Sequence, residues 1–101
     1  MRTGIVTGAA RGIGAAIATR LAAEVDHLVL VDLAPELAGT ADDIAAGGTR
    51  VSPVQVDLTA DAGVDAVVDA LEGRSVDALV NNAGITRDAR LVNMTPPDFR
   101  T

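Results

Sequence analysis

Residues 5–14 read IVTGAARGIG, a short apolar run followed at once by Gly8, Gly12 and Gly14. Such a run, then a glycine loop and a new apolar period, predicts a strand, a tight turn and a helix. Glycines in this turn let the backbone bend sharply and approach a pyrophosphate, whose charge the first N–H groups of the helix attract. An ordinary tight turn is the alternative for the loop taken alone. The spacing G-x-x-x-G-x-G therefore makes nucleotide binding a hypothesis that depends on the rest of the chain.

Short apolar runs alternate with alanine-rich segments along the chain. The runs predict strands over 3–6, 27–31, 51–56 and 78–81, and the segments between them predict helices over 12–24, 35–46 and 61–72. Apolar strands separated by helices are typical of a parallel sheet that is covered on both faces. Right-handed crossovers favour an α/β, doubly wound sheet of the Rossmann type with strand order 3-2-1-4.

Two finer expectations concern the helices. A further helix is expected to begin at about Pro96, after Thr95 as its N-cap. One face of the first helix is predicted to carry Ile13, Ala16, Ile17, Arg20 and Leu21.

The composition favours one soluble domain and excludes several classes of function. The chain has 101 residues, of which 49% are hydrophobic, enough for a single core. A net charge of −6 argues against binding to nucleic acid or to an anionic membrane. No cysteine and a single histidine argue against a metal site and a cysteine nucleophile. Without a secretion signal or an apolar run near the roughly 20 residues that cross a bilayer, we expect a cytoplasmic protein.

The end of the second strand carries an acidic residue, Asp32, followed by Leu33. A carboxylate at this position can accept hydrogen bonds from a ribose diol and would repel a 2′-phosphate. Asp32 is therefore predicted to bind the cofactor, and its neighbour Leu33 is included in the predicted site. Arg11 in the glycine loop favours the opposite cofactor, because a guanidinium can hold a phosphate. A solvated aspartate and an exposed loop arginine are the alternatives. We give Asp32 more weight, so the sequence favours NAD over NADP.

Two further strand ends complete the predicted site. Asp57 and Leu58 end the third strand, where an aspartate could pair with an adenine amino group and a leucine could lie against the ring. A cap or turn is an equally good role for Asp57. The stretch NNAG at 81–84 follows the fourth strand, which neighbours the first in a 3-2-1-4 sheet. Asparagines there can tie the strand ends together, and Ala83 and Gly84 leave room for a ribose or nicotinamide.

These motifs resemble the short-chain dehydrogenase/reductase family over essentially the whole chain. They are TGAARGIG at 7–14, VD at 31–32, DL at 57–58 and NNAG at 81–84. The tail NNAGITRDARLVNMTPPDF is similar to that of 3-oxoacyl-[acyl-carrier-protein] reductases.

The resemblance implies an NAD(P)-dependent oxidoreductase that passes a hydride between nicotinamide and a carbonyl or alcohol, with 3-oxoacyl-thioester reduction as the specific candidate. Its substrate would be a small molecule or an acyl thioester, and the full-length protein would form a homodimer or homotetramer. The residues carried over are Gly8, Arg11, Gly12, Ile13 and Gly14 for the pyrophosphate, Asp32 for the adenosine ribose, Asp57 and Leu58 for adenine, and Asn82, Ala83 and Gly84 for the nicotinamide ribose.

The chain departs from the family in its catalytic residues. The family's catalytic Asn, Ser, Tyr and Lys follow the NNAG motif at a distance, and this chain contains no Tyr and no Lys. No catalytic residue is therefore predicted within it. We expect residues 1–101 to be the N-terminal dinucleotide-binding part of a longer, truncated Rossmann-type domain. The alternative is a non-catalytic dinucleotide-binding or redox-sensing module. His27 is predicted to be structural, and Ser52 has no base nearby in sequence.

Overall fold

The computed structural model describes residues 2–82, and strands and helices alternate throughout this range. The elements are β1 (Thr3–Thr7), α1 (Gly12–Ala22), β2 (His27–Asp32), α2 (Leu37–Ala45), β3 (Arg50–Gln55), α3 (Asp61–Ala70) and β4 (Ala78–Asn81). The helix expected from about Pro96 lies outside the described residues. No helix in the described range is long and apolar enough to span a bilayer.

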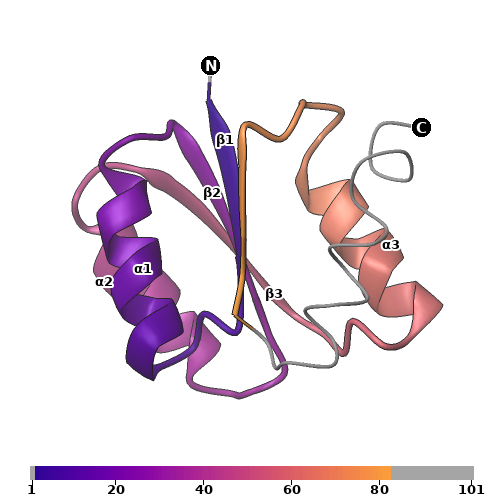
Figure 1. Ribbon diagram of the computed structural model, residues 1–101. Coiled ribbons are helices and arrows are strands. Elements are labelled where there is room, and N and C mark those ends of the chain that lie inside the picture. Colours follow the sequence, from indigo (N-terminus) through magenta and orange to yellow (C-terminus); the bar gives the residue numbers. More distant parts are fainter. Residues whose placement is uncertain (1, 83–101) are drawn as a thin grey trace.

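The strands form one parallel sheet in the order β3-β2-β1-β4, which confirms the predicted α/β, doubly wound Rossmann-type topology. α1 and α2 cover one face of the sheet, and α3 lies on the other (Figure 1). The register pairs Thr7 of β1 with Val31 of β2 and with Asn81 of β4. All strands run in the same direction, so the loops that follow them meet at one edge of the sheet, the carboxyl edge.

The observed elements differ from the predicted ones mainly at their ends. α1 stops at Ala22, and α2 starts at Leu37 because residues 35 and 36 form a turn before it. In this turn the N–H of Leu37 bonds to the carbonyl of Ala34 at 3.2 Å. β3 begins at Arg50, since its register follows β2 from His27 onward. Local sequence patterns set such boundaries only loosely, whereas pairing with a neighbouring strand sets them residue by residue.

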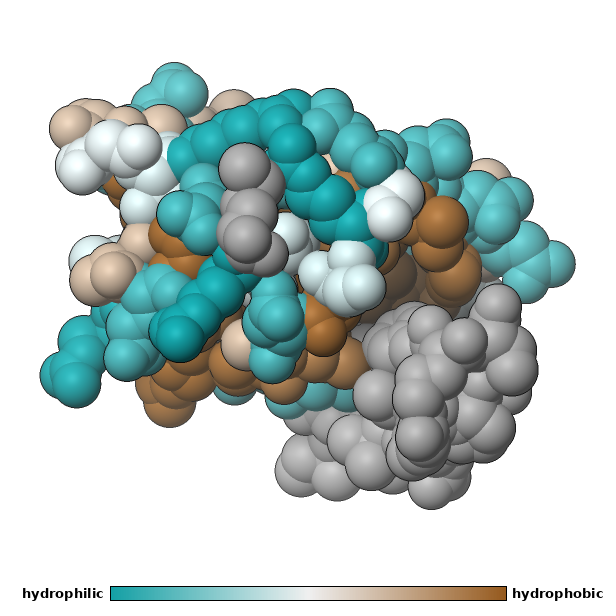
Figure 2. Space-filling view, turned by 90° about the horizontal axis from the view of Figure 1, so that it is seen from above, coloured by the Kyte–Doolittle hydropathy of each residue, from teal (hydrophilic) through white to brown (hydrophobic). Residues whose placement is uncertain are grey.

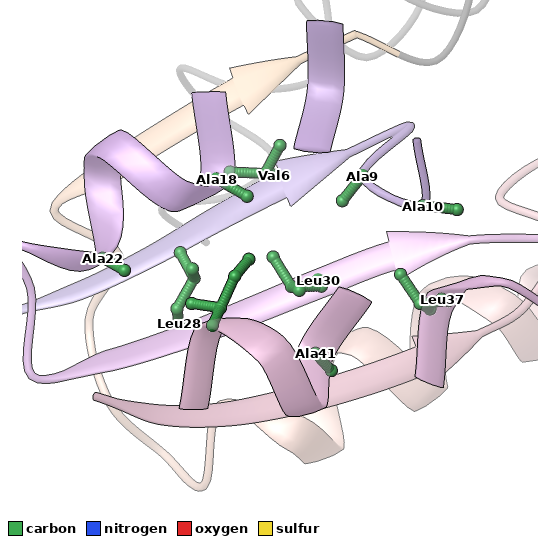
Figure 3. Packing of buried hydrophobic residues seen from close by; sticks show 10 residues of the cluster. Val6, Ala9, Ala10, Ala18, Ala22, Leu28, Leu30, Leu37 and Ala41 are labelled. Carbon is green, nitrogen blue, oxygen red and sulfur yellow. The ribbon is translucent and has the colours of Figure 1, made fainter. Parts of the chain in front are cut away.

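The larger part of the core lies between the sheet and the helices α1 and α2. Val6, Leu28 and Leu30 are fully buried on this face. In Figure 3 these strand side chains point toward small side chains of both helices. The helix residues that complete this cluster are Ala18, Ala22, Leu37, Ala41 and Ile44. Burial of each leucine contributes about 1.5–3 kcal/mol, so this face carries much of the stability.

The face of α1 that packs on the sheet agrees with the predicted one only in part, since Leu21 lies partly buried against the core. Gly14, Ala18 and Ala22 are buried, whereas Ile13 is 73% exposed and Arg20 is also exposed. The helix turns its smallest residues toward β1 and β2, because small side chains let the backbones approach closely. The spacing of large apolar residues in the sequence does not predict packing through small residues.

The opposite face is covered more thinly. Ile5, Val29 and Val31 are buried beneath α3, where Val67, Ala70 and Leu71 pack partly buried against them. β3 forms one edge of the sheet and is half exposed. Its Pro53 has no N–H to offer a further strand, which suits an edge position.

The amino edge of the sheet holds a buried histidine. His27 is fully buried, and its Nε2 lies 2.8 Å from Ser52 Oγ. Burial lowers the pKa of His27, and the positive charges of Arg50 and Arg74 lower it further, against the opposing influence of Glu72. Glu72 also pairs with Arg50 at 2.6 Å. Figure 2 looks onto this edge and shows mainly hydrophilic residues with apolar ones between them.

We expect the buried neutral imidazole of His27 to make the protein less stable in mild acid. Because its folded-state pKa lies below 6.5, the unfolded chain binds more protons than the folded protein just below that pH. Stability should therefore be complete above pH 6.5 and fall by up to about 1.4 kcal/mol per pH unit below it. Urea unfolding between pH 7.5 and about 5.5 measures this slope, and His27→Gln should flatten it.

A histidine signal in NMR gives a second check that does not depend on the variant folding. The imidazole should titrate below pH 6.5 in the folded protein. A titration midpoint above 6.5, or a wild-type slope as flat as that of His27→Gln, would contradict the assignment.

Candidate cofactor site

Hydrogen bonds tie the ends of β1 and β4 together at the carboxyl edge. Thr7 Oγ1 donates to Asn81 Oδ1 at 2.8 Å, and the N–H of Asn82 donates to the same hydroxyl at 3.0 Å. A longer contact of 3.5 Å joins Asn82 Nδ2 to the carbonyl of Gly8. The asparagines thus fix the strand end against the start of the glycine loop, as the sequence suggested.

The glycine loop brings α1 into direct contact with the end of β1. Gly8 and Gly12 have φ of 66° and 62°, a region in which residues with a side chain are strained. A Cβ on Gly14 would overlap the carbonyl of Gly8 and come within 2.8 Å of Asn82 Nδ2. Only glycine therefore allows the first turn of α1 to lie this close to the strand end.

The N-terminus of α1 has no side chain that caps it. Arg11 precedes the helix with an extended backbone and makes no side-chain cap hydrogen bond, and the first turn contains no acidic residue. The N–H groups of the first turn point out of the helix end without partners inside it, and the helix dipole adds partial positive charge there. This helix end can therefore accept an anionic group such as a pyrophosphate.

Asp32 links the glycine loop to the loop that follows β2. Its Oδ2 accepts the N–H of Ala10 at 3.0 Å, and its Oδ1 accepts the N–H of Ala34 at 3.0 Å. An ionised carboxylate has about four lone-pair positions, so these two bonds leave capacity for the hydroxyls of a ribose. The two bonds also hold the side chain in one orientation at the carboxyl edge.

A cavity of about 310 Å³ opens between these loops. This volume is at the lower end of the range of small-molecule sites and suits part of a dinucleotide. The lining residues are Gly8, Arg11, Val31, Asp32, Leu33, Val56, Leu58 and Asn82. The structure therefore brings together six of the residues that the sequence singled out.

Sequence reasoning missed two lining residues, Val31 and Val56. Val31 stands in the VD motif at 31–32 and Val56 in the third predicted strand, but neither is among the residues predicted to hold the cofactor. Each stands at the carboxyl end of its predicted strand, and this position was the signal that could have placed it in the site.

Other residues that were predicted to bind the cofactor do not line the cavity or lie outside the described residues. Gly12 and Gly14 belong to the first turn of α1, and Ile13 projects from that turn with 73% exposure. None of the three lines the cavity. Ala83 and Gly84 lie outside the described residues.

Asp57 takes part in a turn at the end of β3. Its Oδ1 accepts the N–H of Thr59 at 2.9 Å and the hydroxyl of Thr59 at 2.7 Å. This is the turn role that the sequence left open beside adenine binding. The side chain does not line the cavity, although its neighbour Leu58 does.

Arg11 forms an ion pair that the sequence did not suggest. Its Nη1 lies 3.0 Å from Oε2 of Glu36, the residue that precedes α2. The two residues are 25 positions apart, so nothing in the local sequence indicates the contact.

The amino edge offers a less suitable site. Sequence reasoning found no base near Ser52, yet the parallel register brings it within hydrogen-bond distance of His27 Nε2. The His27 Nδ1 atom has no partner among the described residues, so no third group orients the ring as in a nucleophilic triad. Within residues 2–82 no group of three or more His, Asp or Glu side chains could hold a metal ion.

Comparison with known proteins assigns the chain to a family. The family model for short chain dehydrogenase matches residues 2–101. The chain belongs to the short-chain dehydrogenase family. Among relatives, the oxidoreductase UcpA of Escherichia coli K12 is 37% identical over 100 residues, which is 96% of this chain and 38% of UcpA. The chain thus spans about two fifths of the length of this relative.

Two solved structures share the arrangement of the described elements. L-sorbose reductase from Gluconobacter frateurii, complexed with NADPH and L-sorbose, is 40% identical with a TM-score of 0.75, over 83% of this chain and 34% of its own. A 3-oxoacyl-[acyl-carrier protein] reductase with bound NAD from Brucella melitensis is 36% identical with a TM-score of 0.67, over 83% of this chain and 32% of its own.

The contact between Gly14 and Gly8 predicts a sharp difference between two glycines of this chain. Gly14→Ala should lower the free energy of unfolding by about 2 kcal/mol or more, because the methyl group cannot fit. Gly39→Ala in α2 is the matched control, since its new methyl group meets nothing within 4 Å. Alanine is the better helix former, so Gly39→Ala should be neutral or up to about 1 kcal/mol more stable.

Urea denaturation followed by far-ultraviolet circular dichroism measures both variants. If Gly14→Ala unfolded at the wild-type urea midpoint, the close approach of α1 to β1 would be wrong.

Proposed function

We propose that the chain binds the adenosine and pyrophosphate half of a nicotinamide dinucleotide, preferably NAD, in an oxidoreductase. The observation that carries this proposal is the arrangement of Asp32 and the glycine loop around one cavity, with the uncapped end of α1 beside it. Membership of the short-chain dehydrogenase family supports it. When bound, the nicotinamide ring would accept a hydride from an alcohol or donate one to a carbonyl.

The pyrophosphate would lie against the first turn of α1. The N–H groups of Gly12, Ile13 and Gly14 are the donors at this helix end, and the absence of side chains at both glycines lets the phosphates approach the backbone. The approach of α1 to β1 sets the direction in which these N–H groups point. The exposed Ile13 would then stand beside the bound cofactor.

The adenosine would lie over the ends of β2 and β3. The Asp32 carboxylate would accept hydrogen bonds from the ribose diol while keeping its bonds to the two backbone N–H groups. Leu33 and Leu58 would contact the adenine ring, together with Val56 from the same wall. Asp57, whose Oδ1 accepts two hydrogen bonds from Thr59, is the proposed neighbour of the adenine amino group.

The nicotinamide half would extend from Gly8 toward the end of β4. Asn82 lines the cavity there, and its side-chain amide contacts the carbonyl of Gly8. We assign Asn82, Ala83 and Gly84 to the wall beside the nicotinamide ribose.

The choice between NAD and NADP depends on opposing charges at the rim of the cavity. Asp32 would repel a 2′-phosphate, whereas Arg11 would attract it. Similar proteins do not decide the matter, since the L-sorbose reductase structure contains NADPH and the Brucella melitensis reductase contains NAD. We propose NAD because two backbone bonds hold Asp32 in place, while Arg11 is engaged with Glu36.

Catalysis would require residues that this chain does not contain. We propose that residues 1–101 are the cofactor-binding part of a longer Rossmann-type domain whose Tyr and Lys lie in further sequence.

A 3-oxoacyl thioester is the proposed substrate, supported by the tail NNAGITRDARLVNMTPPDF and by similarity to the Brucella melitensis reductase. A ketose or polyol is the second candidate, favoured by the 40% identity to L-sorbose reductase. Cytoplasmic location and assembly into a dimer or tetramer stay predictions.

A downstream coding sequence would separate the enzyme from the alternative, a redox-sensing module without catalysis. The enzyme requires a Tyr-x-x-x-Lys segment after the NNAG motif. Activity with 3-oxoacyl thioesters, but not with ketoses or polyols, would support the proposed substrate, and the reverse pattern would overturn it.

Binding of the two cofactors tests the role of Asp32. Isothermal titration calorimetry should give tighter binding of NAD than of NADP. Asp32→Asn removes the negative charge but keeps an oxygen acceptor, so it should reduce this preference about tenfold, mainly by improving NADP binding. Asp69→Asn makes the same charge change at an exposed position in the last turn of α3 and should leave the preference unchanged. Wild-type binding of NADP as tight as that of NAD would show that Arg11 outweighs Asp32.

A further inference from the structure

The ion pair between Arg11 and Glu36 stands at the rim of the cavity that Arg11 lines. The Arg11 side chain is 75% exposed and that of Glu36 is 51% exposed, so both charges face solvent. Arg11 is the only basic residue among those that line this cavity. Its guanidinium is therefore the group in the described site that could meet an additional phosphate on the adenosine.

Two hydrogen bonds of Ala10 hold the backbone next to Arg11 in place. The Ala10 N–H bonds to Asp32, and the Ala10 carbonyl accepts the hydroxyl of Thr40 in α2. These two bonds fasten the residue before Arg11 to β2 and to α2. The loop therefore presents Arg11 to Glu36 at the start of α2.

We propose that Glu36 is a specificity-determining residue that lowers the affinity of this site for a dinucleotide with a 2′-phosphate. The inference rests on the proposed dinucleotide function and extends it to a residue outside the cavity lining. Glu36 occupies the guanidinium of Arg11 and neutralises its charge. Together with Asp32 it places two negative charges against one positive charge at the point where the 2′-phosphate would arrive.

Removal of the Glu36 charge should free Arg11 for charge-assisted, bidentate hydrogen bonding to the phosphate. The expected gain is modest, because solvent and salt screen exposed charges and Asp32 still repels the phosphate. NADP should bind about three- to tenfold more tightly to Glu36→Gln than to the wild type, whereas NAD affinity should change less than about twofold.

A double-mutant cycle tests whether the gain acts through Arg11. The four proteins are the wild type, Glu36→Gln, Arg11→Gln and the double variant, each titrated with NAD and with NADP by calorimetry. In the Arg11→Gln background, Glu36→Gln should no longer improve NADP binding. Its gain with Arg11 present should also shrink at high salt. Glu24→Gln changes the same charge at an exposed position after the far end of α1 and should leave both affinities unchanged.

Three results would overturn the proposal in distinguishable ways. An unchanged ratio of NADP to NAD affinity in Glu36→Gln would show that Glu36 does not set specificity. An equal gain in the presence and absence of Arg11 would show that Glu36 acts through its own charge and not by holding the guanidinium. Failure of the wild type to bind either cofactor would refute the dinucleotide function on which the proposal rests.

Discussion

The close approach of Gly14 to the carbonyl of Gly8 is the constraint on which the rest of the site depends. With no side chain between them, the first turn of α1 lies directly against the end of β1. That position directs the free N–H groups at the start of α1 toward the carboxyl edge. It also lets Gly14, Ala18 and Ala22 pack buried against the sheet. A larger residue at this point would move the helix and the loop before it.

Asp32 extends this constraint to the second strand. Its two backbone bonds join the loop after β1 to the loop after β2, and Asn82 after β4 contacts the same first loop at the carbonyl of Gly8. The loops at the carboxyl edge are thus fixed by polar contacts, while the strands beneath them are fixed by apolar burial. A site built in this way is held in shape before any ligand arrives, which lowers the cost of binding.

Much of the fold could be predicted from the sequence because its signals are local. Apolar runs and helical segments gave the strand order, and the position of Asp32 at a strand end placed it at the shared edge. The packing face of α1 could be predicted only in part, since the helix buries small residues and exposes Ile13. The contacts of Arg11 with Glu36 and of His27 with Ser52 join distant positions, and only the register and loop geometry bring them together.

In the proposed complex a dinucleotide binds at the carboxyl edge, over the glycine loop and Asp32. Chemical-shift mapping by ¹H–¹⁵N NMR during titration with NAD tests this most directly. We expect the amide signals of residues 10–14 and 32–34 to shift, while those around His27 and Ser52 at the opposite edge stay in place. Saturable shifts around His27, or none at the glycine loop, would contradict it.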